Sequence, residues 1–356
     1  MKRITVVVTT FNGSRFLLPQ LESIRHQSLL PSELIISDDA SSDDTYDLAL
    51  QFAKTAPFST VVLRNPQRLG YIENFFRALT HARFEYIAYC DQDDIWHPQK
   101  LAVCCDALVK SNAVMCTHTA NLIDENSRPI GSFTQGIAKD QIFPPLTLPP
   151  WGLFAGFTQV FEAQLLSLIP AASRGIEYLD PDQRLSHDRW IYFLACCFGN
   201  VVTLSRPLTD YRQHQSNLFG PRDLRTFTGK IIAKLTESPQ NLLLHRDIAK
   251  HRSDILLQFA AENRPAELSA SAERGHLYWS RISELYDLRA QLYTTPSLES
   301  RLAIFNRLLT TGAYRRYKFG GLQPIKLPKD IWLGLFGAKD RHVWRRSKKP
   351  GGHARP

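Results

Sequence analysis

Three carboxylates lie within four residues in the segment Asp91-Gln92-Asp93-Asp94, directly after the apolar run 86–90, which predicts a buried strand. Carboxylates this close repel one another, so a cluster at a strand end is costly unless a cation lies between them. Mg²⁺ usually takes one or two protein carboxylates and completes its shell with water and substrate phosphate. The cluster therefore predicts a divalent metal and a phosphorylated substrate. The alternative is an acidic surface turn, in which Asp93 or Asp94 caps a helix that has Pro98 in its first turn.

Three earlier strand-like runs also end in polar loops. Residues 4–9 lead into Thr10-Phe11-Asn12-Gly13, residues 33–37 lead into an Asp/Ser run, and residues 59–64 lead through Arg68 to a helical pattern over 71–82. The glycine lets the backbone approach a ligand closely. Strands that alternate with helices predict an α/β fold with a mostly parallel sheet, and such sheets bind ligands at the carboxyl ends of their strands.

In this order and at this spacing, three segments resemble the nucleotide-sugar-binding half of glycosyltransferase family 2. They are Val-Val-Thr-Thr-Phe-Asn-Gly (7–13), Ser-Asp-Asp-Ala-Ser-Ser-Asp-Asp-Thr (37–45) and Asp-Gln-Asp-Asp (91–94). The resemblance runs over about residues 1–220 and implies the GT-A fold, a Rossmann-like sheet flanked by helices. It also implies the donor-side residues: Thr10, Phe11 and Asn12 along the nucleotide, Asp38 or Asp39 on the base, Asp91 on the ribose and Asp93 on a Mg²⁺ or Mn²⁺ ion. Arg68 and Asn74 stand where family members approach the donor; a solvated helix-end charge or cap is the alternative for both.

The acceptor half predicted by the resemblance contains two further motifs. A glycine-bearing aromatic loop, 151–157, places Trp151 and Gly156 beneath the acceptor, and the segment 186–190 opens an apolar helix. Asp188 in its first turn corresponds to the family's general base, with His187 and Trp190 on the acceptor side; a capping acid favoured by the helix dipole is the alternative. Arg189 stands where many related sequences have an aromatic residue, a difference expected to affect acceptor choice.

The segment 210–217 follows a predicted short strand, 201–204, that ends at a Pro207 break. It resembles the basic, histidine-bearing segment that closes over the donor diphosphate. Arg212 is the predicted diphosphate contact because guanidinium matches phosphate geometry, and His214 is a predicted metal ligand. A structural histidine is the alternative.

Composition is that of a cytosolic enzyme with one large core. The 356 residues are 44% hydrophobic, and the six cysteines contain no Cys-x-x-Cys pair, so they are expected to be reduced core residues. The apolar run at the N-terminus is too short for a signal peptide, and no run reaches the roughly 18 apolar residues that span a bilayer.

The net charge of +9 is concentrated near the C-terminus. Residues 301–356 contain 14 Lys and Arg against Asp330 and Asp340, a net of +12, whereas residues 1–300 carry −3. Cations alternate with aromatic and apolar side chains over 314–346, a pattern that favours an anionic membrane surface. Nucleic acid is the rival partner, but no binding motif accompanies the charge, and a solvated tail remains the alternative, with a disordered end.

The predicted domains are a catalytic domain at 1–220, with a nucleotide-sugar half at 1–110 and an acceptor half at 111–220, a helical region at 221–313 and the basic aromatic tail at 314–356. The predicted function is metal-dependent, inverting transfer of a sugar from a dTDP- or UDP-linked donor to a glycan or lipid-linked saccharide. The motifs look most like those of bacterial rhamnosyltransferases of polysaccharide assembly, which act in the cytoplasm or at the inner face of the membrane. A sugar-nucleotide nucleotidyltransferase and a non-catalytic nucleotide-sugar-binding protein are the alternatives.

Overall fold

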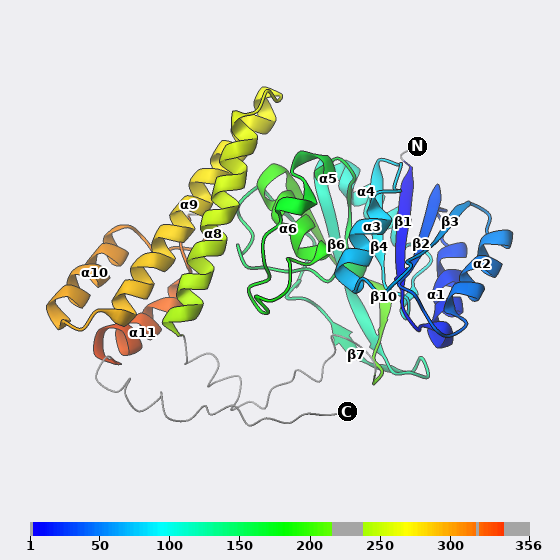
Figure 1. The fold of residues 1–356 in the computed structure, drawn as a ribbon, viewed down its shortest axis with the longest axis horizontal. Helices are drawn as coiled ribbons and strands as arrows, with labels where there is room; N and C mark the ends of the chain where they lie inside the picture. Colours follow the sequence, from blue (N-terminus) through cyan, green and yellow to red (C-terminus); the bar gives the residue numbers. More distant parts are fainter. Residues whose placement is uncertain (1–2, 216–237, 318–319, 338–356) are drawn as a thin grey trace. The chain divides into compact units, whose positions relative to one another are not determined.

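The computed structural model describes residues 3–215, 238–317 and 320–337 (Figure 1). The chain divides into two compact units, one comprising Met1–Leu224 with Leu257–Arg274 and the other Arg225–Leu256 with Gly275–Pro356. The predicted helical region 221–313 therefore contributes to both units, and the further subdivision at residue 110 stays a prediction.

The first unit is built around one sheet whose strands are β1 (Ile4–Thr10), β2 (Glu33–Asp38), β3 (Ser59–Arg64), β4 (Tyr86–Cys90), β5 (Ile95–Trp96), β6 (Ala113–Ile123), β7 (Pro129–Phe133), β8 (Gln141–Phe143), β9 (Val160–Glu162) and β10 (Asn200–Arg212). Its helices are α1 (Ser14–Arg25), α2 (Thr45–Thr55), α3 (Tyr71–Leu79), α4 (Lys100–Ser111), α5 (Leu165–Leu168) and α6 (His187–Phe198), with short 3₁₀ turns η1 (Gly156–Thr158) and η2 (Ala171–Ser173).

The strand order is β3-β2-β1-β4-β9-β6-β10-β5, with β7 on β6 and β8 on β10. Among the described strands, β1, β2, β3 and β4 pair in parallel, as the alternation of strands and helices predicts. The second half of the sheet is mixed: β9 runs antiparallel to β4 and β6, whereas β10 runs parallel to β6. The sheet is thus α/β as predicted, but parallel throughout only in its first half.

Pro207 does not end the last strand, contrary to the sequence-based prediction. β10 runs from Asn200 through Pro207 to Arg212, with register shifts on either side of the proline. A bulge accommodates a residue that has no N–H to donate, which explains why the strand continues. Beyond the bulge, Thr209 and Asp210 pair antiparallel with Trp96 and Ile95 of β5. This pairing brings the segment after β10 beside the segment after β4, although the two are more than a hundred residues apart in sequence.

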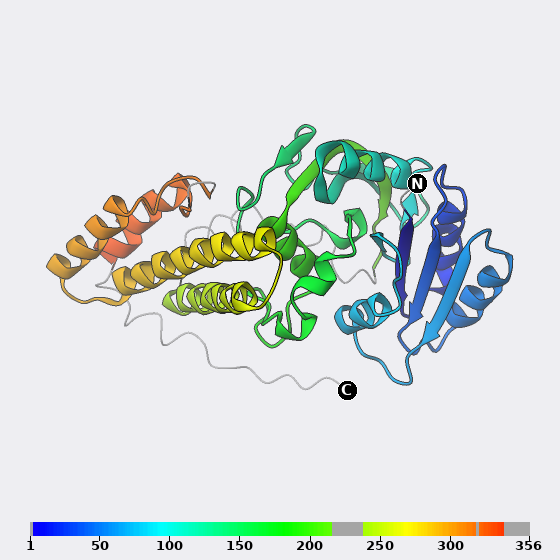
Figure 2. The ribbon, with the colours of Figure 1, turned by 90° about the horizontal axis from the view of Figure 1, so that it is seen from above.

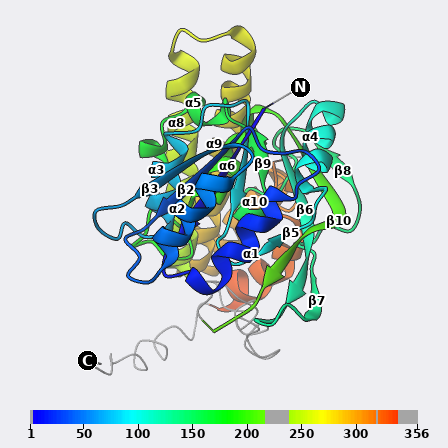
Figure 3. The same cartoon turned by 90° about the vertical axis from the view of Figure 1, so that its right-hand side faces the viewer.

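Two helical layers cover the sheet. Side chains alternate along β1 and β4, so that Val6, Val8 and Cys90 pack with α1, α2 and α4 in one apolar core. Tyr89 points to the other face, where its ring lies 5.1 Å from Phe75 of α3. Figure 2 and Figure 3 show α1 and α2 side by side along the β1–β3 part of the sheet. The loops at the carboxyl ends of β1, β2 and β4 therefore emerge between these layers.

The second unit is helical. It contains most of α8 (Pro239–Ala261) and α9 (Ala266–Thr294), together with α10 (Leu298–Thr310), η5 (Pro324–Lys326), α11 (Leu327–Lys329) and a π-helical turn, η6 (Asp330–Phe336). α8 and α9 are antiparallel neighbours (Figure 2), and Arg246 of α8 reaches Asp287 of α9 at 3.1 Å.

The segment 314–337 is part of this folded unit, which corrects the prediction that a separate tail begins at 314. Asp330 is completely buried and pairs with the equally buried Arg289 at 2.8 Å. The hydroxyls of Tyr293 and Tyr314 donate hydrogen bonds to the same carboxylate at 2.9 and 3.0 Å. Lys318, Ser216, Asn217 and the predicted tail beyond residue 337 lie outside the described residues.

The cysteine prediction agrees with the structure: all six are free thiols, and five are buried. Among the described helices, none is long and apolar enough to cross a bilayer.

Candidate active site

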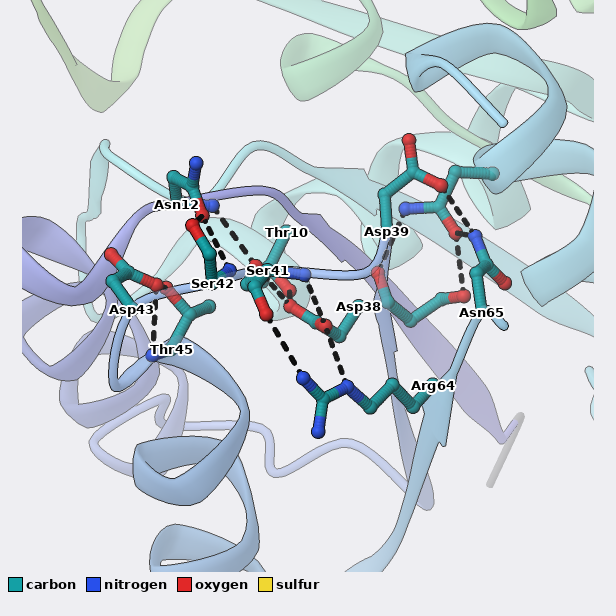
Figure 4. A network of polar contacts seen from close by, with 12 residues as sticks. Thr10, Asn12, Asp38, Asp39, Ser41, Ser42, Asp43, Thr45, Arg64 and Asn65 are labelled. Atoms are coloured by element: carbon teal, nitrogen blue, oxygen red, sulfur yellow. Dashed lines mark hydrogen bonds and ion pairs between the residues drawn. The ribbon is translucent and has the colours of Figure 1, made fainter. Parts of the chain in front are cut away.

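The carboxylate of Asp38 organises the loops that follow β1 and β2 (Figure 4). It is fully buried and accepts hydrogen bonds from the Thr10 hydroxyl at 3.0 Å and from the Ser41 backbone N–H at 2.9 Å. Arg64 of β3 lies 3.8 Å away. Asp38 and Thr10 therefore hold the loops of neighbouring strands together; the predicted contacts of both with the nucleotide stay predictions.

The loop after β1 is fixed to the loop after β2 by its backbone (Figure 4). Asn12 adopts a left-handed φ of 47°, donates its N–H to the Ser41 hydroxyl at 2.9 Å and accepts the Ser42 N–H on its side chain at 2.9 Å. Gly13 donates to the Thr45 hydroxyl at 2.8 Å. Asn12 itself is exposed, so it is available to a ligand at this edge.

Asp39 holds the loop that leads into α3. Its carboxylate accepts hydrogen bonds from the Asn65 amide at 2.6 Å and from the backbone N–H groups of Leu69 and Gly70 at 2.7 and 2.8 Å. Asn65 also donates to Asn74 at 3.1 Å. Asn74 is 1% exposed, so it is neither a solvated cap nor accessible to the donor. It supports the loop that leads into α3 through its hydrogen bond with Asn65. The predicted hydrogen bond from Asp39 to the base stays a prediction.

Phe11 and Gln92 join the first loop to the carboxylate cluster. Phe11 donates its N–H to the Gln92 side chain at 2.9 Å and accepts from it on its carbonyl at 3.2 Å. A Cβ on Gly13 would lie 2.1 Å from the same amide oxygen, which explains the glycine. On the other side, the exposed Arg68 guanidinium lies 3.9 Å from the centre of the Phe11 ring. The ring and this cation thus form one surface beside the cluster.

The carboxylates after β4 are crowded and poorly hydrated. Burial, with the charges of Asp93 and Asp188 added, raises the pKa of Asp91 to about 7. Burial also raises the pKa of Asp94 well above its ordinary value; one of its oxygens accepts the Arg212 backbone N–H at 3.0 Å, and the other has no hydrogen-bond partner among the described residues. Such a cluster favours binding of a cation.

Asp93 of this cluster lies beside His214, which follows β10. The His214 ring nitrogen Nε2 lies 2.8 Å from Asp93 Oδ2, and the ring packs 4.8 Å from that of Phe16. Among the described residues no group of three or more His, Cys, Asp and Glu side chains is arranged to hold a metal. Two protein ligands still fit a divalent ion whose shell is completed by diphosphate and water, and the crowded carboxylates nearby fit its charge. The metal assignment of both residues stays a prediction.

Arg212 is a buried side chain that holds Asp93 in position. Its side chain is 2% exposed, and its Nε donates to the Asp93 carbonyl at 2.8 Å while Nη1 donates to Ser127 at 2.9 Å. The guanidinium lies 4.8 Å from the Phe16 ring. These contacts position Asp93 and the loop at 124–127; the predicted diphosphate contact would require the guanidinium to leave them.

Asp188 is a carboxylate at the start of α6. It lies in the first turn of α6, and its Oδ1 accepts the Ser186 hydroxyl at 2.6 Å and the Arg189 N–H at 2.8 Å. No described residue hydrogen-bonds its Oδ2. Burial raises the pKa of Tyr71 to about 12, and the charge of Asp188 adds to this shift. The same charge raises the pKa of Asp91, so Asp188 lies near both groups. One oxygen is therefore anchored, and the other is left for chemistry.

His187 packs behind this carboxylate rather than beside a ligand. It is 5% exposed, stacks on Phe75 with ring centres 3.8 Å apart and meets the Tyr89 ring edge-on at 4.8 Å. Burial lowers the pKa of the imidazole to about 4, and its Nδ1 has no described partner. A Cβ on Gly156 would lie 2.8 Å from its Nε2. Gly156 thus lets the aromatic loop lie against α6, and the predicted acceptor contact of His187 is replaced by a packing role.

The prediction for Trp190 is wrong, because this side chain is 1% exposed and packs against Phe193 within the core. α6 is buried at nearly every position, and Trp190 is among these buried residues. Trp151 is half-buried, and its ring meets Tyr178 edge-on at 5.7 Å. Arg189 pairs with Glu177 at 3.1 Å and donates to the Tyr178 hydroxyl at 3.0 Å. Trp151 and Arg189 therefore both contact Tyr178, and an acceptor-side role for Trp151 stays a prediction.

Sequence reasoning missed Lys100, the first residue of α4. Its ammonium is fully buried, donates to the Phe157 carbonyl at 2.6 Å and the Thr209 hydroxyl at 3.1 Å, and lies 3.6 Å from the Trp96 ring. Burial lowers its pKa to about 8, and its charge lowers that of Asp91. A cation in the first turn of a helix opposes the helix dipole, and this is the sequence signal that could have pointed to Lys100.

The chain resembles known glycosyltransferases in sequence. Residues 5–163 match glycosyl transferase family 2. An uncharacterised glycosyltransferase of Nostoc sp. is 27% identical over 60% of this chain and 66% of its own length. A dTDP-rhamnosyl transferase, RfbG of Shigella flexneri, is 33% identical over 30% of this chain and 38% of its own length. The chain thus spans less than two thirds of either curated relative.

Among solved structures, S. aureus TarS residues 1–349 in complex with UDP-GlcNAc is 14% identical, with a TM-score of 0.52 over 86% of this chain and 79% of that chain. At this identity the likeness shows the fold alone. The predicted GT-A fold with a C-terminal helical region is confirmed.

Proposed function

We propose, from the match of residues 5–163 to glycosyl transferase family 2, that the protein moves a sugar from a nucleotide-sugar donor to an acceptor hydroxyl, with inversion at the anomeric carbon. The observation that carries the proposal is the position of Asp188. A carboxylate with one oxygen anchored by Ser186 and Arg189 lies close enough to Asp91 for its charge to raise the pKa of that carboxyl. A base on one side and a diphosphate-binding cluster on the other are what a single displacement requires.

In the proposed reaction, the acceptor oxygen forms a bond to the anomeric carbon while the bond from that carbon to the diphosphate oxygen breaks. The electron pair of the broken bond leaves with the nucleoside diphosphate. The proton of the acceptor hydroxyl passes to Asp188 Oδ2, and general-base assistance of this kind contributes about 10²–10⁴ in rate. Attack from the side of Asp188, opposite the leaving group, inverts the configuration.

Asp93 and His214 would hold a divalent ion, Mg²⁺ or Mn²⁺. The ion would neutralise the negative charge that develops on the diphosphate. Arg212 keeps Asp93 in position by hydrogen-bonding its carbonyl. Phe11 and Arg68 form the surface beside these carboxylates, so we assign them to the nucleotide or the donor sugar.

For the donor we propose dTDP-rhamnose, with a UDP-linked sugar as the second candidate, and for the acceptor a saccharide of a growing cell-surface glycan, free or lipid-linked. The likeness to a dTDP-rhamnosyl transferase supports the first donor.

The test is turnover by the full-length protein with a panel of dTDP- and UDP-sugars, each with Mn²⁺, with Mg²⁺ and with a chelator. Transfer releases nucleoside diphosphate, and metal dependence supports the role of Asp93. Release or consumption of pyrophosphate would identify a nucleotidyltransferase instead. Tight donor binding without any turnover, with all candidate acceptors present, would identify a non-catalytic binding protein.

A further inference from the structure

Large apolar side chains are exposed on the last described segment of the second unit. Ile325 is 76% exposed, Trp332 74% and Phe336 63%. Trp332 and Phe336 are four residues apart on η6, so they lie on the same side of this helical turn. Solvent exposure of a tryptophan and a phenylalanine together on one turn is unfavourable unless another surface covers them.

The outward direction of these rings is determined by what lies beneath them. Asp330 is held by Arg289, and Leu335 is 5% exposed, so both face the interior of the unit. A Cβ on Gly334 would lie 2.7 Å from Leu292 of α9, which shows how closely this turn is packed on the helix. The turn is thus anchored on one side and presents Trp332 and Phe336 on the other.

The segment that carries these side chains is basic. Arg315 and Arg316 are exposed and follow Tyr314, whose hydroxyl reaches Asp330 at the start of η6; Lys326 follows Ile325, and Lys329 ends α11. Within residues 301–356 the only acidic residues are Asp330, which is buried in an ion pair, and Asp340. The exposed charge of the described part of this segment is therefore basic. Basic side chains beside exposed aromatic rings are typical of surfaces that bind at the headgroup layer of an anionic membrane.

We propose that this face, comprising Ile325, Trp332 and Phe336 with Arg315 and Arg316, docks onto an anionic lipid surface. The rings enter the headgroup layer, and the cations contact lipid phosphates. The proposal goes beyond the transferase function and can fail without affecting it. Lipid is favoured over nucleic acid because the centre of the face is apolar and no described strand or helix carries a nucleic-acid-binding motif beside it.

The experiment is co-sedimentation of the full-length protein with phosphatidylcholine vesicles, with and without about one third phosphatidylglycerol, at about 0.05 M and 0.5 M salt. The variants are Trp332→Ser with Phe336→Ser, and Arg315→Gln with Arg316→Gln. Val109→Ser is the matched control, because Val109 is also exposed (56%) but lies on α4 of the first unit. The midpoint of thermal unfolding and the far-UV circular dichroism of each variant show whether its fold is intact.

We expect wild-type protein to bind the anionic vesicles, with binding weakened by salt. The double aromatic variant should bind about tenfold or more weakly, since it loses the burial of two large side chains. The double arginine variant should also lose about tenfold or more, and the control should stay within about twofold. Equal binding by wild type and aromatic variant, or no vesicle binding by wild type, would overturn the proposal. Vesicle-independent binding of an oligonucleotide that the arginine variant loses would identify the rival partner.

Discussion

Replacement of Asp188 by asparagine separates chemistry from binding at this site. Asparagine is nearly isosteric, and its carbonyl oxygen can accept the hydrogen bonds that Asp188 Oδ1 receives from Ser186 and Arg189. The amide then occupies the place of Oδ2 and cannot take a proton. Loss of general-base assistance corresponds to about 10²–10⁴ in rate, or about 3–5 kcal/mol in the activation barrier. Because both anchoring hydrogen bonds survive, the free energy of unfolding should change by no more than about 1 kcal/mol.

The assay is single-turnover transfer with saturating donor, together with calorimetric binding of nucleoside diphosphate. We expect transfer to fall by at least about a hundredfold while nucleotide affinity stays within about twofold. Asp182→Asn is the control, because Asp182 is exposed and its replacement removes the same charge six residues away. Near-normal transfer by the Asp188 variant would mean that another group is the base. Loss of nucleotide binding would mean that Asp188 acts through the structure of the donor site.

Three further predictions follow from the cluster and its supports. Asp93→Ala should abolish turnover and remove the metal dependence of nucleoside diphosphate binding, measured by calorimetry with and without Mn²⁺; metal-dependent binding that persisted would exclude Asp93 as a ligand. Lys100→Met should lower the free energy of unfolding in urea by about 1–3 kcal/mol, because the Phe157 carbonyl and Thr209 hydroxyl lose their buried donor, and an unchanged midpoint would contradict this. Burial lowers the pKa of His187 from 6.5 to about 4, so its contribution to the free energy of unfolding is fully present above pH 6.5. About 3 kcal/mol of that free energy should be lost as the pH falls through 4. The His187→Leu variant should lack this part of the dependence of the free energy of unfolding on pH. Equal slopes in both proteins would show that His187 is not buried in its neutral form.

The positions of the donor-side loops could be predicted because they depend on patterns of residues close together in the sequence. A β-branched strand that breaks into Thr10-Phe11-Asn12-Gly13, and carboxylates that follow an apolar run, need only strand periodicity and the rule that ligands bind at carboxyl ends of parallel strands. The same reasoning predicted α6 and the position of Asp188 in its first turn. Burial of Trp190 was not predicted, because the helix is apolar on several sides and only its packing partners decide which side faces the core.

By itself, the sequence determined the α/β class, the positions of the first four strands along the chain, the family resemblance and the basic character of residues 301–356. Each of these depends on residue type and short-range spacing. Only the tertiary structure decided which polar groups meet. The contact of Asp93 with His214 depends on a strand that continues past Pro207 and pairs with β5. The burial of Asp330 against Arg289 turns part of an expected tail into a folded unit with one exposed aromatic face. Such contacts join residues about 40 to 120 positions apart, and no local propensity encodes them, because their free energy comes from the desolvation and pairing of groups that approach one another only after folding.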